Sequence, residues 1–152
     1  MALDKLKIIL ADDDSDDREI FKLAISQLDI NAELCLFENG LDLLNHLRDS
    51  HSNLPNFLFL DLNMPSMDGV ECLRRIKGHP KLKGINVIIY STSSSKKDIE
   101  KTFEEGANIY LSKPSDYSIL KDSLKKILTL DWQCNTSMSN ADSFLFNLKL
   151  DN

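Results

Sequence analysis

The segment KIILADDDSDD, residues 7–17, joins a short apolar run to a cluster of five carboxylates. The run over residues 7–10 has the length of a β-strand, and the acids begin where that strand should end. Five like charges so close together repel one another unless a positive group lies against some of them or some of them cap a helix. The segment therefore predicts a buried strand that leads directly into a charged site and a helix.

Four further apolar runs of strand length follow: ELCLF (33–37), FLFL (57–60), NVIIY (86–90) and NIYL (108–111). Apolar residues at helical spacing occupy the segments between these runs and the segment after the last one. Strands that are apolar throughout are buried on both faces, and strands separated by helices pair in parallel through right-handed crossovers. The pattern predicts an α/β fold, a doubly wound parallel sheet of five strands.

Capping signals mark the ends of two expected helices. Ser95 and Asp98 have the spacing of a capping box before the fourth helix, and Gly106 follows that helix. Ser115 is placed to cap the fifth helix.

The helical period is lost after about residue 130, and an apolar pattern returns in SFLFNLKL (143–150). Residues 129–152 are too few for a domain, so we expect one domain over residues 5–128 and a short tail. Trp132 and the aromatic pair in residues 144–146 are expected to cover part of this domain rather than to bind a cofactor.

Composition excludes several classes of function. The chain has 152 residues, 42% of them apolar, which is enough to close one core. Its 18 basic and 24 acidic side chains give a net charge of −6, so we expect no binding to nucleic acid or to a membrane surface. No apolar run approaches the ~20 residues of a membrane helix, and residues 1–10 are too charged for a signal peptide. We therefore expect a cytoplasmic protein.

The three cysteines give no sign of a disulfide framework or a zinc site. Cys35, Cys72 and Cys134 are odd in number, widely spaced and without a C-x-x-C pair. They are expected to be core or surface thiols.

Polar residues stand at the carboxyl ends of the predicted strands, the edge at which open parallel sheets bind ligands. Asp12 and Asp13 follow the first strand, Asp61 the third, Ser91 the fourth and Lys113 the fifth. Three carboxylates around one point stay ionised only beside a cation, and an all-oxygen donor set suits a hard divalent ion such as Mg²⁺. Lys113 supplies a further positive charge.

Four motifs together resemble the receiver domain of bacterial response regulators, of which the chemotaxis regulator is the minimal form. They are the acid pair Asp12-Asp13, DLNMP (61–65) with Asp68-Gly69 behind it, Ser91-Thr92, and GANIYLSKP (106–114). Each motif alone is weak, but their order and their places at matching strand ends are specific. The resemblance spans about residues 5–128. It implies a flavodoxin-like (βα)5 sheet of strand order 2-1-3-4-5 in a stand-alone regulator without a separate output domain.

The resemblance also implies the acceptor and the metal ligands. Asp61 would receive the phosphoryl group. Mg²⁺ would be held directly by Asp13, Asp61 and the backbone carbonyl of Asn63, and through water by Asp12.

Further roles follow from the same resemblance. Lys113 would pair with Asp61 and later with the phosphoryl group, aimed inward by a cis peptide bond to Pro114. Ser91 would donate a hydrogen bond to a phosphoryl oxygen, and Tyr110 would be the aromatic switch. Thr92 would face the signalling side.

Elementary chemistry agrees with a receiver of phosphate rather than a kinase. Phosphoryl transfer needs mainly positioning and charge neutralisation, so a carboxylate nucleophile, a metal and a lysine suffice. The chain has no G-x-x-x-x-G-K-[ST] loop for nucleotide, so the donor must bring an activated group such as phosphohistidine. We expect a sensor histidine kinase or a histidine phosphotransfer protein as donor, and a downstream protein or a second copy docked on residues 95–128. The loop GHPKLKG (78–84) is similar to stand-alone receivers that serve phytochrome-like and other sensor kinases.

Several of these residues also have a plainer interpretation. Asp14, Asp16 and Asp17 fall at the start of the first helix, where negative charge is favoured, so only two of the five acids are assigned to chemistry. Tyr110 alternates with apolar neighbours and could simply be packed in the sheet. The histidines lack ligand-like spacing and are expected at the surface: His46, His51 and His79.

Two other functions use similar residues. Phosphatases of the haloacid dehalogenase class also place an aspartate nucleophile and Mg²⁺ at a strand end, but they carry a second acid two residues later, where this chain has Asn63. A receiver-like module that binds partners without phosphorylation is the second alternative. The complete set of acids, serine and lysine argues against it.

Overall fold

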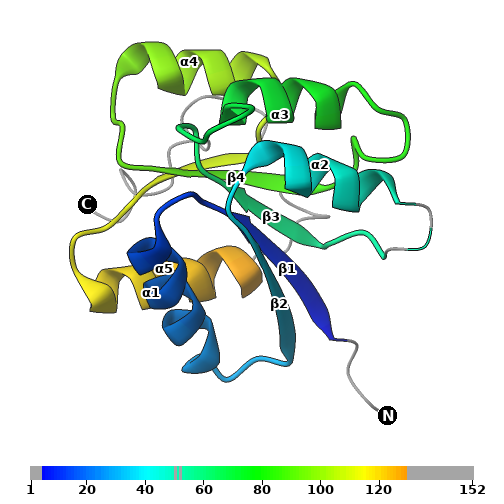
Figure 1. Cartoon of the computed structure of the whole chain (residues 1–152). Helices are drawn as coiled ribbons and strands as arrows, with labels where there is room; N and C mark the ends of the chain where they lie inside the picture. Colours follow the sequence, from blue (N-terminus) through cyan, green and yellow to red (C-terminus); the bar gives the residue numbers. More distant parts are fainter. Residues whose placement is uncertain (1–4, 50, 52, 130–152) are drawn as a thin grey trace.

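Five parallel strands form one sheet in the order β2-β1-β3-β4-β5, as predicted (Figure 1). The computed structural model describes residues 5–49, 51 and 53–129. Strands and helices alternate: β1 Leu6–Ala11, α1 Ser15–Ser26, β2 Ala32–Phe37, α2 Gly40–Arg48, β3 Phe57–Leu60, α3 Gly69–Lys77, β4 Asn86–Ser91, α4 Lys96–Glu104, β5 Ile109–Ser112 and α5 Tyr117–Thr129. None of the described helices combines the length and apolar character that a bilayer crossing requires.

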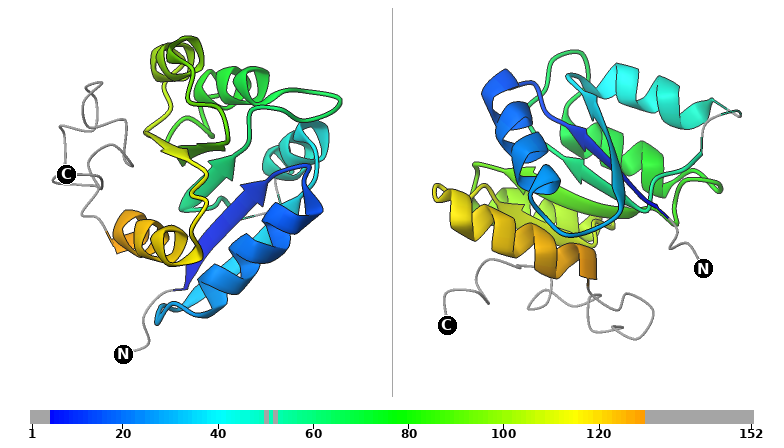
Figure 2. Two further views of the ribbon diagram at one scale, coloured as in Figure 1. Left: turned by 90° about the vertical axis from the view of Figure 1, so that its left-hand side faces the viewer. Right: turned by 90° about the horizontal axis from the view of Figure 1, so that it is seen from below.

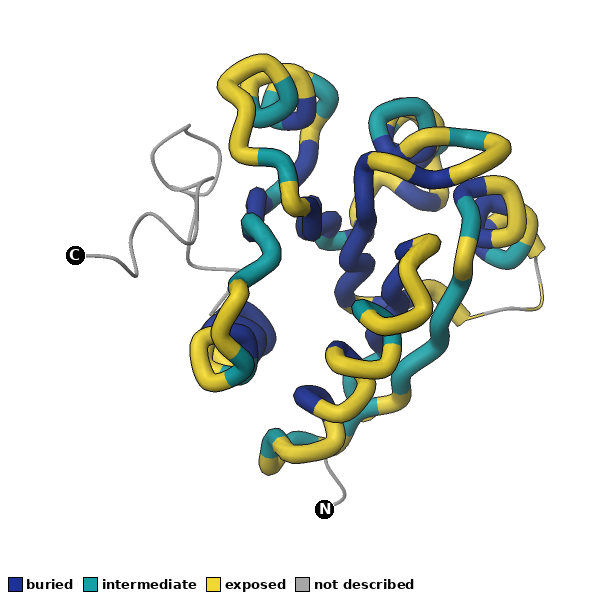
Figure 3. The backbone as a smooth tube through the Cα atoms, turned by 60° about the vertical axis from the view of Figure 1, so that its left-hand side comes forward, coloured by how far each residue is buried: buried dark blue, intermediate teal, exposed yellow. Residues whose placement is uncertain are grey.

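Helices cover both faces of the sheet. Helices α1 and α5 lie on one side, and α2, α3 and α4 on the other (Figure 2). Successive strand residues point to opposite faces, so Ile8 packs toward α1 and α5 while Ile9 packs toward α2 and α3. Strand β3 is buried throughout, β1 and β4 are buried beyond their first residues, and the outer surfaces of the helices are exposed (Figure 3).

Side chains cap the helices in the manner the sequence suggests, with one exception. Ser95 accepts a hydrogen bond from the Asp98 N–H at the start of α4, and Gly106 follows α4 with a φ of 97°. The prediction for Ser115 was wrong, because the Asp116 carboxylate accepts hydrogen bonds from the N–H groups of Ser118 and Ile119 at 2.7 and 3.3 Å. Aspartate caps a helix as well as serine does, and its charge is also favourable there.

We expect Asp116→Ala to lower the free energy of unfolding by about 1 kcal/mol, because two N–H groups at the start of α5 lose their acceptor. Urea unfolding followed by circular dichroism measures the change. Ser115→Ala, one residue earlier and also exposed, is the matched control and should leave stability nearly unchanged. Equal losses in the two variants would contradict the assignment of the cap.

Candidate functional site

The register of the sheet brings the predicted site residues to one edge. Ala11 lies opposite Leu60 in the β1–β3 pair, so Asp12 and Asp61 follow directly on adjacent strands. The Asp61 N–H donates to the Ala11 carbonyl at 3.0 Å, which fixes this alignment beyond the strands.

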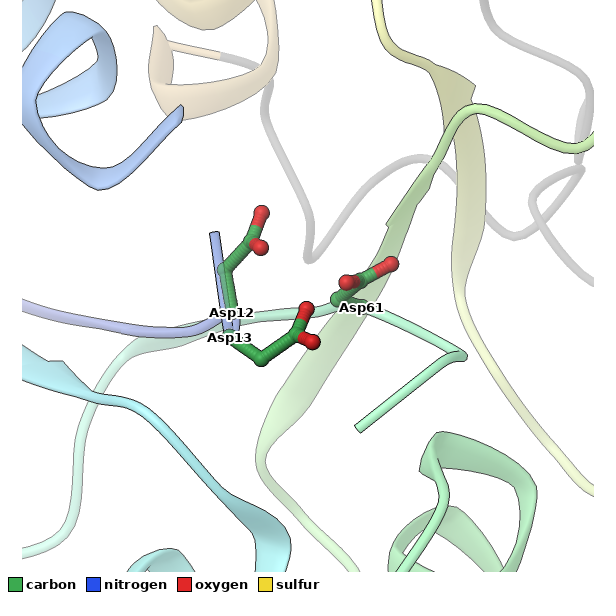
Figure 4. Close-up of side chains that lie close together, drawn as sticks. All are labelled: Asp12, Asp13 and Asp61. Atoms are coloured by element: carbon green, nitrogen blue, oxygen red, sulfur yellow. The ribbon is translucent and has the colours of Figure 1, made fainter. Parts of the chain in front are cut away.

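Asp12, Asp13 and Asp61 converge closely enough to share one cation. A carboxylate oxygen from each lies within 4.8 Å of the others (Figure 4). Asp12 and Asp61 are buried, whereas Asp13 is exposed, so the cluster opens to solvent on one side. Among the described residues this is the single group of three acidic, histidine or cysteine side chains with such spacing. Three oxygen donors with one open side have the chemistry of a divalent cation site.

The electrostatics of Asp61 support this interpretation. Burial and, to a lesser extent, the nearby Asp12 carboxylate raise the pKa of the Asp61 carboxyl to about 7, and the Lys113 ammonium only partly offsets this rise. The Leu62 N–H donates to Asp61 Oδ1 at 2.9 Å and favours the ionised form. The negative charge here exceeds what the protein's own groups compensate, so a bound cation fits the site.

Lys113 is the positive group at this edge, but its nearest partners differ from the one expected. Its Nζ lies 2.7 Å from Asp12 Oδ2, 2.7 Å from Asp17 Oδ2 and 3.9 Å from Asp61 Oδ2. Burial lowers the pKa of this ammonium, but the contacts with Asp12 and Asp17 outweigh burial and raise the pKa above its usual value. Lys113 is therefore charged, and it is shared among three carboxylates.

The expected cis bond between Lys113 and Pro114 was wrong, because the described residues contain no cis peptide. The Lys113 N–H donates to the Ser91 carbonyl at 2.8 Å, which continues the pairing of β5 with β4. This backbone position already brings the ammonium to the acids. The trans form, favoured by about 0.5–1 kcal/mol, thus suffices.

Asp17 is the contact that sequence reasoning missed. It was assigned to the helix start together with Asp14 and Asp16, but Asp14 alone is the N-cap and accepts from the Asp17 N–H at 3.0 Å. The carboxylate of Asp17 is then free to meet Lys113. The apolar residue Phe21 four positions later could have indicated this, because it places Asp17 on the inner face of the helix.

The loop after β4 links Ser91 to Tyr110. Ser91 is buried, and its Oγ accepts from the Ser93 N–H at 3.1 Å. Tyr110 is also fully buried, and its hydroxyl donates to the Ser93 carbonyl at 2.8 Å. Tyr110 is thus turned inward in this structure, and its role as the aromatic switch stays a prediction. Thr92, which lies between Ser91 and Ser93 in the chain, is exposed.

The remaining sequence-based candidates lie elsewhere. Asn63 is exposed in the loop after β3, and the role of its carbonyl stays a prediction. His51 is exposed as expected, whereas His46 and His79 are half-buried. The His46 ring packs 5.0 Å from that of Phe37. Cys35 and Cys72 are free thiols. Cys134 and Trp132 lie outside the described residues.

Gly69 lets the loop after β3 close onto the acceptor strand. Its N–H donates to the Leu62 carbonyl at 2.8 Å, and a Cβ at this position would collide with the Asp61 carbonyl oxygen. The motif Asp68-Gly69 thus combines a helix cap, since Asp68 accepts from the Glu71 N–H, with a close backbone approach.

The model of the response regulator receiver domain family matches residues 8–125. The chain belongs to this family. Receiver domains act in two-component signalling, where they interact with histidine kinases or phosphotransfer proteins, and aspartate phosphorylation with Mg²⁺ binding is typical of the family.

Similar receiver proteins cover most of the chain. Response regulator Rcp1 of Synechocystis sp. is 33% identical over 124 residues, which are 79% of this chain and 82% of Rcp1. Chemotaxis protein CheY1 of Helicobacter pylori is 28% identical, over 81% of this chain and 97% of CheY1. The crystal structure of the phosphorylated cyanobacterial phytochrome response regulator RcpA superposes with a TM-score of 0.77 at 30% identity, over 82% of this chain and 91% of RcpA. The structure of the Mn²⁺-bound form of Rcp1 superposes with a TM-score of 0.75 at 30% identity, over 86% of this chain and 96% of Rcp1.

The raised pKa of Asp61 predicts a pH-dependent cost to the stability of this receiver domain. Between about pH 4 and pH 7 the unfolded chain has lost the Asp61 proton that the folded state keeps, so stability falls as pH rises through this window. Without divalent cations, Asp61→Asn should be more stable than the wild type at about pH 8 by about 1–3 kcal/mol, since one pKa unit corresponds to about 1.4 kcal/mol.

Urea unfolding in a chelating buffer at about pH 5 and about pH 8 tests this prediction. The difference in free energy of unfolding between Asp61→Asn and the wild type should be smaller at the lower pH. Asp122→Asn removes an exposed carboxylate on α5 and is the matched control. If Asp61→Asn and the wild type have the same free energy of unfolding at about pH 8, or if their difference does not change with pH, the Asp61 carboxylate does not destabilise the fold.

Proposed function

We propose that this chain is a phosphoacceptor response regulator, which takes a phosphoryl group from a phosphohistidine of a sensor histidine kinase or phosphotransfer protein onto Asp61 with Mg²⁺. The observation that carries the proposal is the environment of Asp61. A buried carboxylate at the end of β3 lies within 4.8 Å of an acid pair and 3.9 Å from a charged lysine. The family match supports the same function.

The chain's own residues supply the nucleophile, a positive charge and a hydrogen-bond donor for the transfer step. A carboxylate oxygen of Asp61 attacks phosphorus, the P–O bond of the aspartyl phosphate forms, the P–N bond to the donor imidazole breaks, and its electron pair leaves with the imidazole. The Lys113 ammonium offsets charge on the phosphoryl oxygens, and the Ser91 hydroxyl donates to one of them. Water later returns the phosphoryl group to solution. The protein thus catalyses only its own phosphorylation and dephosphorylation.

Asp12, Asp13, Asp61 and the Asn63 carbonyl would hold the Mg²⁺. Held by these residues, the ion would supply charge neutralisation for the phosphoryl transfer. Support comes from the spacing of the three carboxylates and from the Mn²⁺-bound form of the relative Rcp1. The all-oxygen donor set suits Mg²⁺ and Mn²⁺ alike, so the choice of Mg²⁺ rests on the family, in which Mg²⁺ binding is typical.

The output is proposed to pass through protein contacts on residues 95–128, to a downstream partner or a second copy. The hydrogen bonds from Ser91 through Ser93 to Tyr110 support this route. The division into a receiver domain over 5–128 and a tail over 129–152 is part of the proposal, and residues 130–152 lie outside the described residues. A cytoplasmic location and the lack of nucleic acid or membrane binding stay predictions. The likeness to RcpA makes a phytochrome-type kinase the first donor to test.

We expect a small phosphodonor such as acetyl phosphate to label Asp61 alone when Mg²⁺ is present. Mass spectrometry of the digested protein locates the label. Asp61→Asn should not be labelled, and Lys113→Gln should be labelled roughly 100-fold more slowly, because the developing negative charge loses its positive partner.

Chelation of the metal is the control and should stop the labelling. Labelling at another residue would refute the acceptor assignment. Steady release of phosphate from general phosphomonoesters would instead indicate a phosphatase, and no labelling at all would indicate a binding module.

We expect phosphorylation to be sensed on α4 and β5, because Ser91 and Ser93 join the acceptor site to both. Backbone amide NMR shifts with and without beryllofluoride, a mimic of the phosphoryl group, measure the response. Changes should extend from the Asp12, Asp61 and Lys113 pocket into residues 95–111. Changes confined to the pocket would contradict this route of output.

A further inference from the structure

Lys113 is held on the α1 side of the site by Asp17, a residue to which the transfer chemistry gives no role. The two atoms Lys113 Nζ and Asp17 Oδ2 are 2.7 Å apart, whereas Nζ and Asp61 Oδ2 are 3.9 Å apart. Asp12 is the second close partner at 2.7 Å. The ammonium therefore makes its shorter contacts with two carboxylates that do not receive the phosphoryl group.

The fold fixes Asp17 in this place through an aromatic cluster. Phe21, one helical turn after Asp17, is fully buried, and its ring packs 5.0 Å from that of Phe59 and 5.6 Å from that of Tyr90. The Lys113 ammonium lies 5.3 Å from the centre of the Tyr90 ring. Because Phe21 is anchored against Tyr90, the residue one turn earlier meets the lysine that lies over that same ring.

We propose that Asp17 is a positioning residue that restrains Lys113 from the acceptor and so opposes the phosphorylated state. This inference rests on the proposed function. When the phosphoryl group adds negative charge at Asp61, the ammonium turns toward it, and the contact with Asp17 lengthens or breaks. The cost of losing that contact is subtracted from the stabilisation of the phosphoryl group.

Removal of the Asp17 charge should strengthen the phosphorylated state rather than disorder the site. Lys113 keeps its contact with the fully buried Asp12, so it stays at the edge of the sheet. The Asp17 side chain is 31% exposed against 9% for Lys113. Its replacement by an amide of the same shape therefore leaves a neutral group that water can reach, and the fold should tolerate it.

The test is the affinity of the Mg²⁺-loaded protein for beryllofluoride, measured by calorimetry. We expect Asp17→Asn to bind it roughly two- to fivefold more tightly than the wild type, the range of a partly exposed ion pair. Asp16→Asn is the matched control, because it removes an exposed charge from the same helical turn and should bind as the wild type does. Asp17→Glu keeps the negative charge and should bind beryllofluoride with the affinity of the wild type.

Phosphorylation rates from a small donor then show whether the effect passes through Lys113. In a Lys113→Gln background, the further change Asp17→Asn should leave the rate unchanged. The inference is overturned if Asp17→Asn binds no more tightly than Asp16→Asn, or if its effect is the same without the lysine. Failure of the wild type to bind beryllofluoride, or binding that persists in Asp61→Asn, would overturn the proposed function as well.

Discussion

Repulsion among buried carboxylates is the constraint on which this structure depends. The pairing of β1 with β3 places the buried carboxylates Asp12 and Asp61 side by side at the ends of adjacent strands. The apolar faces of the sheet leave neither strand free to slip. Lys113 compensates part of this charge and is itself divided among three acids. The negative charge of Asp61 is therefore only partly compensated in the folded protein. Such a carboxylate binds a cation because the positive charge relieves the imbalance.

A short chain of hydrogen bonds links this charged edge to the helix that holds least tightly to the core. Ser93 accepts from Tyr110 through its carbonyl and donates through its hydroxyl to Asp98 in α4 at 2.6 Å. In α4 only Thr102 is buried, with Ile99 and Phe103 partly so. Displacement of such a helix exposes little apolar surface and costs little free energy. A change in position at Ser91 can thus move α4 while the sheet stays fixed.

Sequence reasoning found what depends on local pattern and missed what depends on distant geometry. The continuous apolar runs specified buried parallel strands, and their ends located Asp12, Asp13, Asp61, Ser91 and Lys113 at one edge. The contact of Lys113 with Asp17 joins residues 96 positions apart. It depends on the packing of the Phe21 ring in α1 against the Tyr90 ring in β4. Nor could the sequence show that Tyr110 is already turned inward, because its orientation depends on a carbonyl in another loop. The cap of α5 differed by one residue because Ser115 and Asp116 both have capping side chains.

A phosphatase that uses an aspartate nucleophile also needs a proton donor for turnover, so the residues around Asp61 bear on the proposed function. Asn63 occupies the position two residues after the acceptor, so no second acid follows Asp61 in its loop. Within the described part of the chain, the acids nearest Asp61 are Asp12, whose oxygen contacts the Lys113 ammonium, and Asp13, whose oxygen belongs to the cation site. Neither is poised to give a proton to a leaving group or to take one from water. The proposed signalling function requires a phosphoryl group on Asp61 that water removes slowly, and an acid at position 63 would oppose that requirement.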